Sequence, residues 1–252
     1  MAVATIHLPR LSEREARQIA RANATMATPV VFVHSPWLLP SSWAPWARLF
    51  ENAGYVAVTP SWPDDPDVLA GNGMAEIADY HESIIRRLER RPVVVGHSVG
   101  GLLAEILAGR GLSRASVAIS PAPLRGVVPL PFSAPLTYEQ FRYAFANAVD
   151  AAEAVRLYEL FSAVDAASAN LNPWIEARID SINPDRGPLL IISADSDHTV
   201  PWPVAYASFE RERANSGLTE IVKMDGRGHS LTIDHGWREV ADTALAFLRR
   251  FS

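Results

Sequence analysis

Short apolar runs alternate with longer helical patterns from Pro29 to the end of the chain. The helical patterns cover about residues 75–90, 99–110 and 237–251. The apolar runs are as short as buried strands and occupy residues 30–33, 55–59, 92–95, 115–119, 189–192 and 219–224. Continuous apolar strands separated by helices are typical of a parallel sheet that is covered on both faces. The pattern therefore predicts an α/β fold with a mostly parallel sheet of about six strands and helices on both faces.

The same pattern divides the chain into three parts. Residues 120–186 carry no strand pattern, are rich in Ala, Tyr and Phe, and begin with several prolines. We interpret them as a helical lid inserted into a core of residues 29–119 and 187–252, with a second small domain that has no catalytic role as the alternative. Residues 1–28 form an N-terminal appendage, in which Ser12 and Glu15 predict a capping box that opens a short helix. We expect the first 25 residues to be either a loosely docked helix or an artefact of the assigned start site.

Composition narrows the classes of partner. Of the 252 residues, 48% are hydrophobic and 20% are charged, which is typical of a globular protein. The net charge of -5 and the absence of a polybasic block argue against a nucleic-acid or membrane-surface partner. No stretch approaches the roughly 18 apolar residues of a membrane span. The chain has no cysteine, which excludes disulfides, thiolate metal sites and a cysteine nucleophile, and we expect a cytoplasmic protein. The sequence leaves a homodimer open.

A candidate nucleophile lies in the segment Gly96-His97-Ser98-Val99-Gly100-Gly101. This segment directly follows one predicted strand and precedes a helical pattern. A G-x-S-x-G nucleophile elbow requires that setting, because the sharp turn projects the serine hydroxyl above the sheet. The turn also places the backbone N–H of Val99 at a helix start, where negative charge is favoured. We predict that Ser98 is the nucleophile and Val99 an oxyanion donor; the alternative is a glycine-rich turn with packing value only.

A serine nucleophile needs a base, and the base needs an orienting carboxylate. Among seven histidines, His229 is the best candidate, because it follows the last predicted strand in a loop flanked by glycines. Asp197 is the preferred carboxylate, because it follows the strand at 189–192 and begins an Asp-x-x-Val-Pro turn; Asp195 is the alternative. His34 more simply shapes its own loop by hydrogen bonding. The chain order Ser98, Asp197, His229 is that of the α/β-hydrolases.

These features together make the chain resemble the α/β-hydrolase superfamily over residues 29–252. Within it, the chain is similar to bacterial single-domain serine hydrolases of the esterase and lactonase type. Besides the elbow, the resemblance is carried by residues 33–34, 37–43, 197–201 and 226–230. It implies a lid over the pocket and a mechanism without a cofactor or metal. It does not fix the substrate, because this fold hosts many reactions.

One departure from the family pattern concerns the oxyanion hole. The family usually has His-Gly-x after the first core strand, and the N–H of x is the second donor. This chain has His34-Ser35-Pro36-Trp37, and proline has no N–H. Loss of one such donor costs roughly 3 kcal/mol. Either the Ser35 hydroxyl donates, or the loop shifts so that the Trp37 N–H donates, or acyl transfer is slow.

We expect a serine hydrolase that cleaves a small apolar or aromatic ester or lactone through an acyl-enzyme. Trp37 and Phe141 are the predicted pocket walls, because aromatic side chains are plentiful in both segments. Two alternatives remain. The hydroxyl of Ser35 resembles the threonine that plant hydroxynitrile lyases of this fold carry after the histidine, which implies a lyase or other non-hydrolytic use of the triad. A non-enzymatic small-molecule receptor on the same fold is the second alternative.

Overall fold

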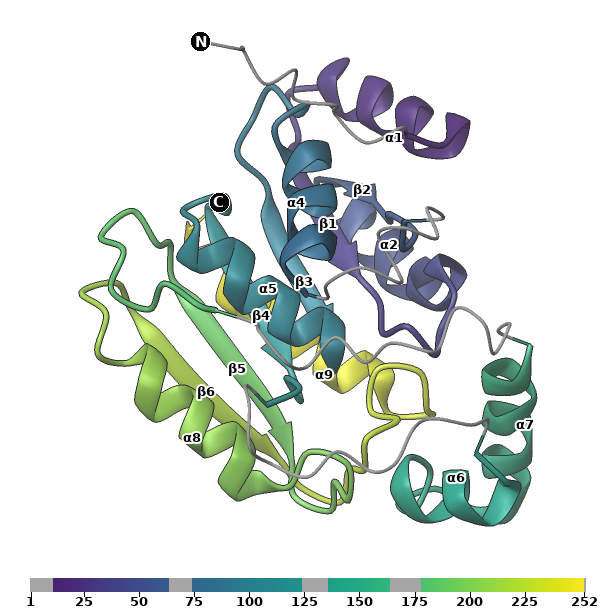
Figure 1. The fold of residues 1–252 in the computed structure, drawn as a ribbon. Coiled ribbons are helices and arrows are strands. Elements are labelled where there is room, and N and C mark those ends of the chain that lie inside the picture. The colour runs from purple at the N-terminus through teal and green to yellow at the C-terminus, as the bar shows by residue number, and fades with distance from the viewer. Residues whose placement is uncertain (1–10, 64–73, 124–135, 164–177, 252) are drawn as a thin grey trace, which may run out of the picture.

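We describe a computed structural model of the chain over residues 11–63, 74–123, 136–163 and 178–251. A six-stranded sheet runs through its centre in the order β2-β1-β3-β4-β5-β6, and every neighbouring pair is parallel (Figure 1). The strands are β1 (Thr28–Val33), β2 (Tyr55–Val58), β3 (Val93–His97), β4 (Ala115–Ile119), β5 (Leu189–Ala194) and β6 (Thr219–Met224). The prediction of a mostly parallel sheet of about six strands is confirmed.

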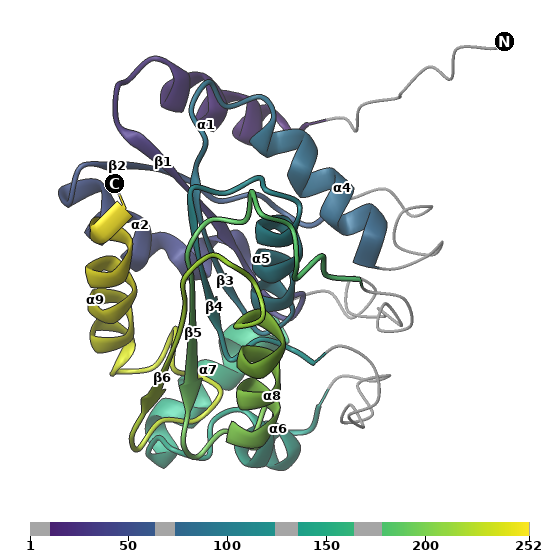
Figure 2. The same cartoon turned by 90° about the vertical axis from the view of Figure 1, so that its left-hand side faces the viewer.

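Helices cover both faces of the sheet, as the edge-on view shows (Figure 2). One face carries α1 (Glu13–Asn23), α4 (Met74–Ile85), α5 (Val99–Gly109) and α8 (Trp202–Glu212). The other face carries α2 (Ala44–Asn52) and α9 (Trp237–Leu248), and short 3-10 turns lie at Pro40–Trp43 and Arg249–Phe251. The helical patterns of the sequence correspond to α4, α5 and α9, whereas α2 was not predicted.

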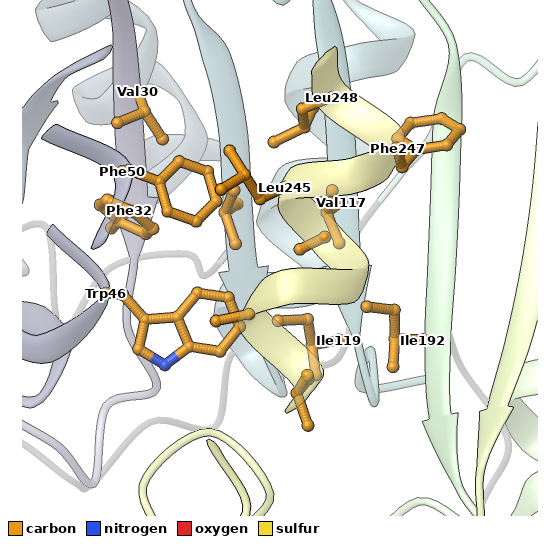
Figure 3. Close-up of a cluster of buried hydrophobic side chains, with 14 of the residues drawn as sticks. Val30, Phe32, Trp46, Phe50, Val117, Ile119, Ile192, Leu245, Phe247 and Leu248 are labelled. Carbon is orange, nitrogen blue, oxygen red and sulfur yellow. The ribbon is translucent and has the colours of Figure 1, made fainter. Parts of the chain in front are cut away.

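Alternate residues of each strand supply the two cores. Val30 and Phe32 of β1 point toward α2 and α9, while Val31 and Val33 pack against the helices of the opposite face. Figure 3 shows the first of these clusters, in which Trp46 and Phe50 lie beside β1 and the C-terminal part of α9 covers the central strands. Because both faces are buried, the strands read as continuous apolar runs.

Helix α1 begins where the sequence predicts, since Ser12 and Glu15 form the expected capping box. Its contacts tie it to the core. Ile19 and Ala22 pack in the cluster on the α4 and α5 face, and the fully buried Glu15 accepts hydrogen bonds from Ser61 N and Tyr80 Oη, both at 2.9 Å. Helix α1 is thus docked through apolar and polar contacts.

Two further helices lie at the carboxyl ends of the strands (Figures 1 and 2). They are α6 (Tyr138–Ala144) and α7 (Ala151–Ser162), and both fall within the segment for which a helical lid was expected. Their shared core contains Phe141, Phe145, Leu157 and Phe161. That these helices form a lid, and the outer limits of that lid, stay predictions.

Candidate active site

Ser98 occupies the single-residue turn between β3 and α5. Its backbone has φ 57° and ψ -117°, a left-handed region that costs a non-glycine residue roughly 1–3 kcal/mol. Three hydrogen bonds hold the turn. Ser98 N donates to Ile119 O at 2.9 Å, and Ser98 O accepts from Leu102 N at 3.0 Å and Ala122 N at 2.9 Å. A strained backbone conformation persists only where surrounding contacts enforce it, and such conformations are common at functional sites.

The two glycines that flank the turn are required by close backbone packing. A Cβ at Gly96 would overlap the carbonyl of Gly100, and a Cβ at Gly100 would overlap the carbonyl of Val33. The start of α5 therefore lies directly against the end of β1. This packing brings Val99, the first residue of α5, next to the loop that begins at His34.

Ser98, His229 and Asp197 form one hydrogen-bonded chain. His229 Nε2 lies 3.0 Å from Ser98 Oγ, and His229 Nδ1 lies 2.8 Å from Asp197 Oδ2. The second carboxylate oxygen, Asp197 Oδ1, accepts from the backbone N–H groups of Thr199 and Val200, both at 2.8 Å. All three side chains are buried. The geometry is that of a nucleophile, its base and the group that orients the base.

Asp195, the alternative carboxylate, does not reach His229. Its side chain is exposed and accepts from the Arg227 backbone N–H at 3.2 Å. This bond joins the loop that follows β5 to the loop that carries His229. Asp195 thus contributes to the contact between the two loops, while Asp197 faces the imidazole.

A second imidazole lies against His229. The ring centroids of His97 and His229 are 4.8 Å apart, and His97 is fully buried. Burial, followed by the proximity of His229, holds the pKa of His97 well below its ordinary value. His97 is therefore neutral beside the base.

The loop after β1 contains the other expected oxyanion donors. His34 Nδ1 donates to Ser35 O at 2.8 Å, and Leu38 N donates to the same carbonyl at 3.0 Å, so residues 35–38 form a tight turn with Pro36 at its second position. His34 thus shapes its own loop, and its burial lowers its pKa to about 4. Ser35 Oγ is buried and has no hydrogen-bond partner among the residues that the structure describes. The Trp37 ring stacks on Phe161 of α7 at a centroid distance of 5.7 Å.

The aromatic residue at the end of α6 that contacts His229 is Phe145, whereas the sequence points to Phe141. Phe141 is fully buried among Phe145, Tyr158 and Phe161 in the interior of the α6–α7 pair, and its role as a pocket wall stays a prediction. The Phe145 ring meets His229 edge-on at 5.1 Å. Both residues lie in one aromatic-rich stretch, and only the packing of α6 decides which ring faces the site.

The family follows from comparison with known proteins. Residues 30–243 match the family described as the Alpha/beta hydrolase family. The chain belongs to the alpha/beta hydrolase family. This span includes Ser98, Asp197 and His229, as well as the lid helices. No curated protein is significantly similar to the chain in sequence.

Solved structures with the same fold are similar to the chain at low sequence identity. A hydrolase from Oleispira antarctica, olei00960, is 13% identical with a TM-score of 0.69, over 96% of this chain and 99% of its own. A bromoperoxidase from Bacillus anthracis is 19% identical with a TM-score of 0.67, over 89% and 92%. An extracellular alpha/beta-hydrolase from a Paenibacillus species is 15% identical with a TM-score of 0.62, over 87% and 98%.

Residues 11–63, 74–123, 136–163 and 178–251 contain no group of three or more His, Asp or Glu side chains that could hold a metal ion. Across the same ranges, no helix has both the length and the apolar character needed to cross a membrane.

Proposed function

We propose that this alpha/beta hydrolase is a cofactor-independent serine hydrolase that cleaves a carboxylic ester or lactone. The observation that carries the proposal is the continuous hydrogen-bonded chain from Ser98 Oγ through His229 to Asp197. An alcohol such as serine is a weak nucleophile, and a base at 3.0 Å from its oxygen removes that limitation.

In the proposed reaction, Ser98 Oγ attacks the carbonyl carbon while His229 Nε2 takes its proton. Collapse of the tetrahedral intermediate breaks the bond to the leaving alcohol, which receives that proton from His229. Water then attacks the acyl-enzyme while His229 takes its proton. The bond between the acyl carbon and Ser98 Oγ breaks, Ser98 Oγ receives that proton from His229, and the carboxylic acid leaves. Asp197 holds the imidazole in the productive tautomer and stabilises its protonated form.

The oxyanion of each intermediate requires hydrogen-bond donors. The Val99 N–H is the first, because the first N–H groups of a helix have no partner within it. For the second, the unpartnered hydroxyl of Ser35 supports a side-chain donor, with the Trp37 N–H as the other candidate. Pro36 has no backbone N–H and therefore cannot be a donor.

A small apolar or aromatic substrate suits the surroundings of this site. Phe145 lies beside His229, and Trp37 and Phe161 continue the aromatic surface from the lid to the first loop. A cavity of about 360 Å³ adjoins that loop, and half of its lining residues are apolar, among them Leu38, Leu160 and Ile233. We propose that the acyl or alcohol part of the substrate contacts this surface.

The direct test is pre-steady-state hydrolysis of p-nitrophenyl esters of increasing acyl length. A burst of one nitrophenolate per protein, absent in Ser98→Ala, is the expected result, because acylation releases the alcohol before water releases the acid. Ser98→Ala should keep the wild-type unfolding transition. Turnover retained in Ser98→Ala would refute Ser98 as the nucleophile.

A lyase that uses the triad as a base is the second candidate, and the unpartnered Ser35 hydroxyl is the observation that favours it. A lyase would cleave a cyanohydrin into aldehyde and cyanide without an acyl-enzyme. Cyanide release that depends on Ser98 and Ser35, with no ester burst, would support the lyase. An ester burst without cyanide release would support the hydrolase.

A further inference from the structure

The carbonyl end of lid helix α6 is bound by the two loops that carry the acid and the base. The last carbonyls of a helix have no partner within it and must find one elsewhere. Here His198 Nδ1 donates to Tyr143 O at 2.9 Å, Thr199 Oγ1 donates to Ala144 O at 2.7 Å, and Ser230 N donates to Phe145 O at 3.0 Å. The first two donors follow Asp197 directly in sequence, and the third follows His229.

Thr199 joins this helix end to the catalytic acid. Its backbone N–H donates to Asp197 Oδ1 at 2.8 Å, while its hydroxyl donates to Ala144 O at 2.7 Å. Thr199 therefore orients the carboxylate of Asp197 through its main chain and binds the end of α6 through its side chain. Displacement of the hydroxyl from Ala144 would release the loop that aims Asp197 at His229.

The loop that carries the base packs against the same part of the lid. A Cβ at Gly228 would lie 2.7 Å from Asn147 Oδ1 and 3.2 Å from the Ala148 side chain, so this glycine permits a close approach. Asn147 Nδ2 donates to Ser196 O at 2.8 Å, which adds a fourth hydrogen bond between residues 143–147 and the two loops.

The segment that makes these contacts is itself fixed. The Arg142 guanidinium donates to Ala146 O at 2.8 Å and to Val149 O at 2.6 Å, which holds the turn between α6 and α7. Residues 143–149 are thus held in place and form the surface that the acid and base loops contact.

We infer that the C-terminal end of α6 positions the acid and the base, and that Thr199 is the positioning residue that transmits this order to Asp197. This inference rests on the proposed function of the triad. The end of α6 is then a fixed part of the site, because a movement that detached it would also loosen the Asp197–His229 pair. We therefore expect the end of α6 to stay in place when substrate enters.

Thr199→Val tests this role, because valine keeps the shape of threonine and its backbone N–H but has no hydroxyl. We expect kcat to fall between about 10- and 100-fold, a loss typical of a misplaced catalytic group, with KM nearly unchanged. The acidic limb of the pH–rate profile should move to lower pH, because a carboxylate held less firmly stabilises protonated His229 less. Thr199→Ser, which restores a hydroxyl, should recover most of kcat.

Thr243→Val is the matched control. Thr243 Oγ1 donates to Glu239 O at 2.9 Å on α9, so its substitution removes a hydroxyl–carbonyl bond from a helix outside the site. It should leave kcat and the pH profile as in the wild type. Equal kcat for Thr199→Val and wild type, or equal losses in Thr199→Val and Thr243→Val, would overturn the inference.

A spectroscopic readout separates this inference from the proposed function. The proton between His229 Nδ1 and Asp197 Oδ2 should give a low-field proton NMR resonance, assigned by its loss in His229→Ala. Thr199→Val should shift or broaden this signal and Thr199→Ser should retain it, whether or not the wild type hydrolyses esters. An unshifted signal in Thr199→Val would refute the positioning role, while a wild type without an ester burst would refute only the hydrolase.

Discussion

At the scale of single residues, the site depends on a few backbone positions that tolerate no alternative. The positive φ of Ser98 aims its hydroxyl at His229, and the glycines at 96 and 100 make room for that turn. Each member of the triad follows the end of a strand. Because the carboxyl ends of parallel strands share one edge of the sheet, their meeting could be predicted from sequence.

What the sequence could not decide at this scale is side-chain direction. Asp195 and Asp197 follow the same strand two residues apart, and only the folded loop shows that Asp197 faces the imidazole. The contact of Phe145 with His229 likewise depends on how α6 is rotated against the core. Local pattern carries no information about that rotation.

Asp197→Asn should cost far more activity than Asp195→Asn. The amide cannot hold His229 in the productive tautomer, and in a triad this change lowers kcat by about 10⁴-fold. Asp195→Asn should change kcat little, because the exposed Asp195 accepts from the backbone of the loop that carries His229 and does not contact the imidazole. Steady-state kinetics of the two variants provides the measurement, and the reverse ranking would reassign the acid.

At the scale of elements, the strands were predictable and several helices were not. A strand buried on both faces is a continuous apolar run, which the sequence displays directly. Helix α2 lies in a segment with Pro40 and Pro45, and prolines in a sequence suggest a loop. Proline is nevertheless tolerated in the first turn of a helix. The hydrogen bonds that fix α6 leave no pattern, because their acceptors are main-chain carbonyls.

A buried carboxylate is one of the contacts that dock helix α1 on the core. Glu15 Oε2 accepts from Ser12 N, Ser12 Oγ and Tyr80 Oη, at 2.9, 2.7 and 2.9 Å, and Oε1 accepts from Ser61 N at 2.9 Å. Burial acts to raise the pKa of Glu15, but these hydrogen bonds outweigh it and the pKa lies below its ordinary value. The stabilisation is therefore present above the unfolded pKa and is lost as pH falls.

Glu15→Ala should lower the free energy of unfolding at pH 7 by about 3 kcal/mol, because it leaves buried donors unpaired. Glu13→Ala is the control in the same helical turn, and its exposed ion pair with Arg17 predicts a change within about 0.5 kcal/mol. Urea unfolding measures both. Equal stabilities of the two variants would mean that α1 is only loosely attached to the core.

At the scale of the whole molecule, buried ionisable groups set the response to pH. Glu105 on α5 is fully buried and is held by Ser208 and Arg211 of α8, which links two helices across one face. Burial raises its pKa to about 7; Arg211 opposes this shift and Glu212 adds to it. His34 responds in the opposite sense, because burial lowers its pKa to about 4.

The two pKa shifts have opposite signs, so the two groups change the free energy of unfolding in opposite directions as pH rises. The folded protein binds a proton at Glu105 more readily than the unfolded chain does, so this contribution to stability is full below pH 4.5 and is lost as pH rises toward 7. The unfolded chain binds a proton at His34 more readily, so that contribution is present above pH 6.5 and is lost as pH falls toward 4. Each shift corresponds to roughly 3 kcal/mol over its window.

Glu105→Gln removes the pH dependence of stability that Glu105 contributes. Relative to the variant, the wild type should lose roughly 3 kcal/mol of unfolding free energy between pH 4.5 and pH 7.5. Glu139→Gln, the same change at an exposed residue of α6, should run parallel to the wild type. Urea unfolding at several pH values gives the curves. Parallel curves for Glu105→Gln and wild type would show that Glu105 titrates normally.

The central claim is that His229 and Asp197 activate Ser98 as a nucleophile. Intact-protein mass after exposure to a fluorophosphonate tests it most directly, because the reagent phosphonylates an activated serine whatever the natural substrate is. We predict one adduct on the wild type and none on Ser98→Ala, with both proteins folded. An unmodified wild type, or the same adduct on Ser98→Ala, would contradict the claim.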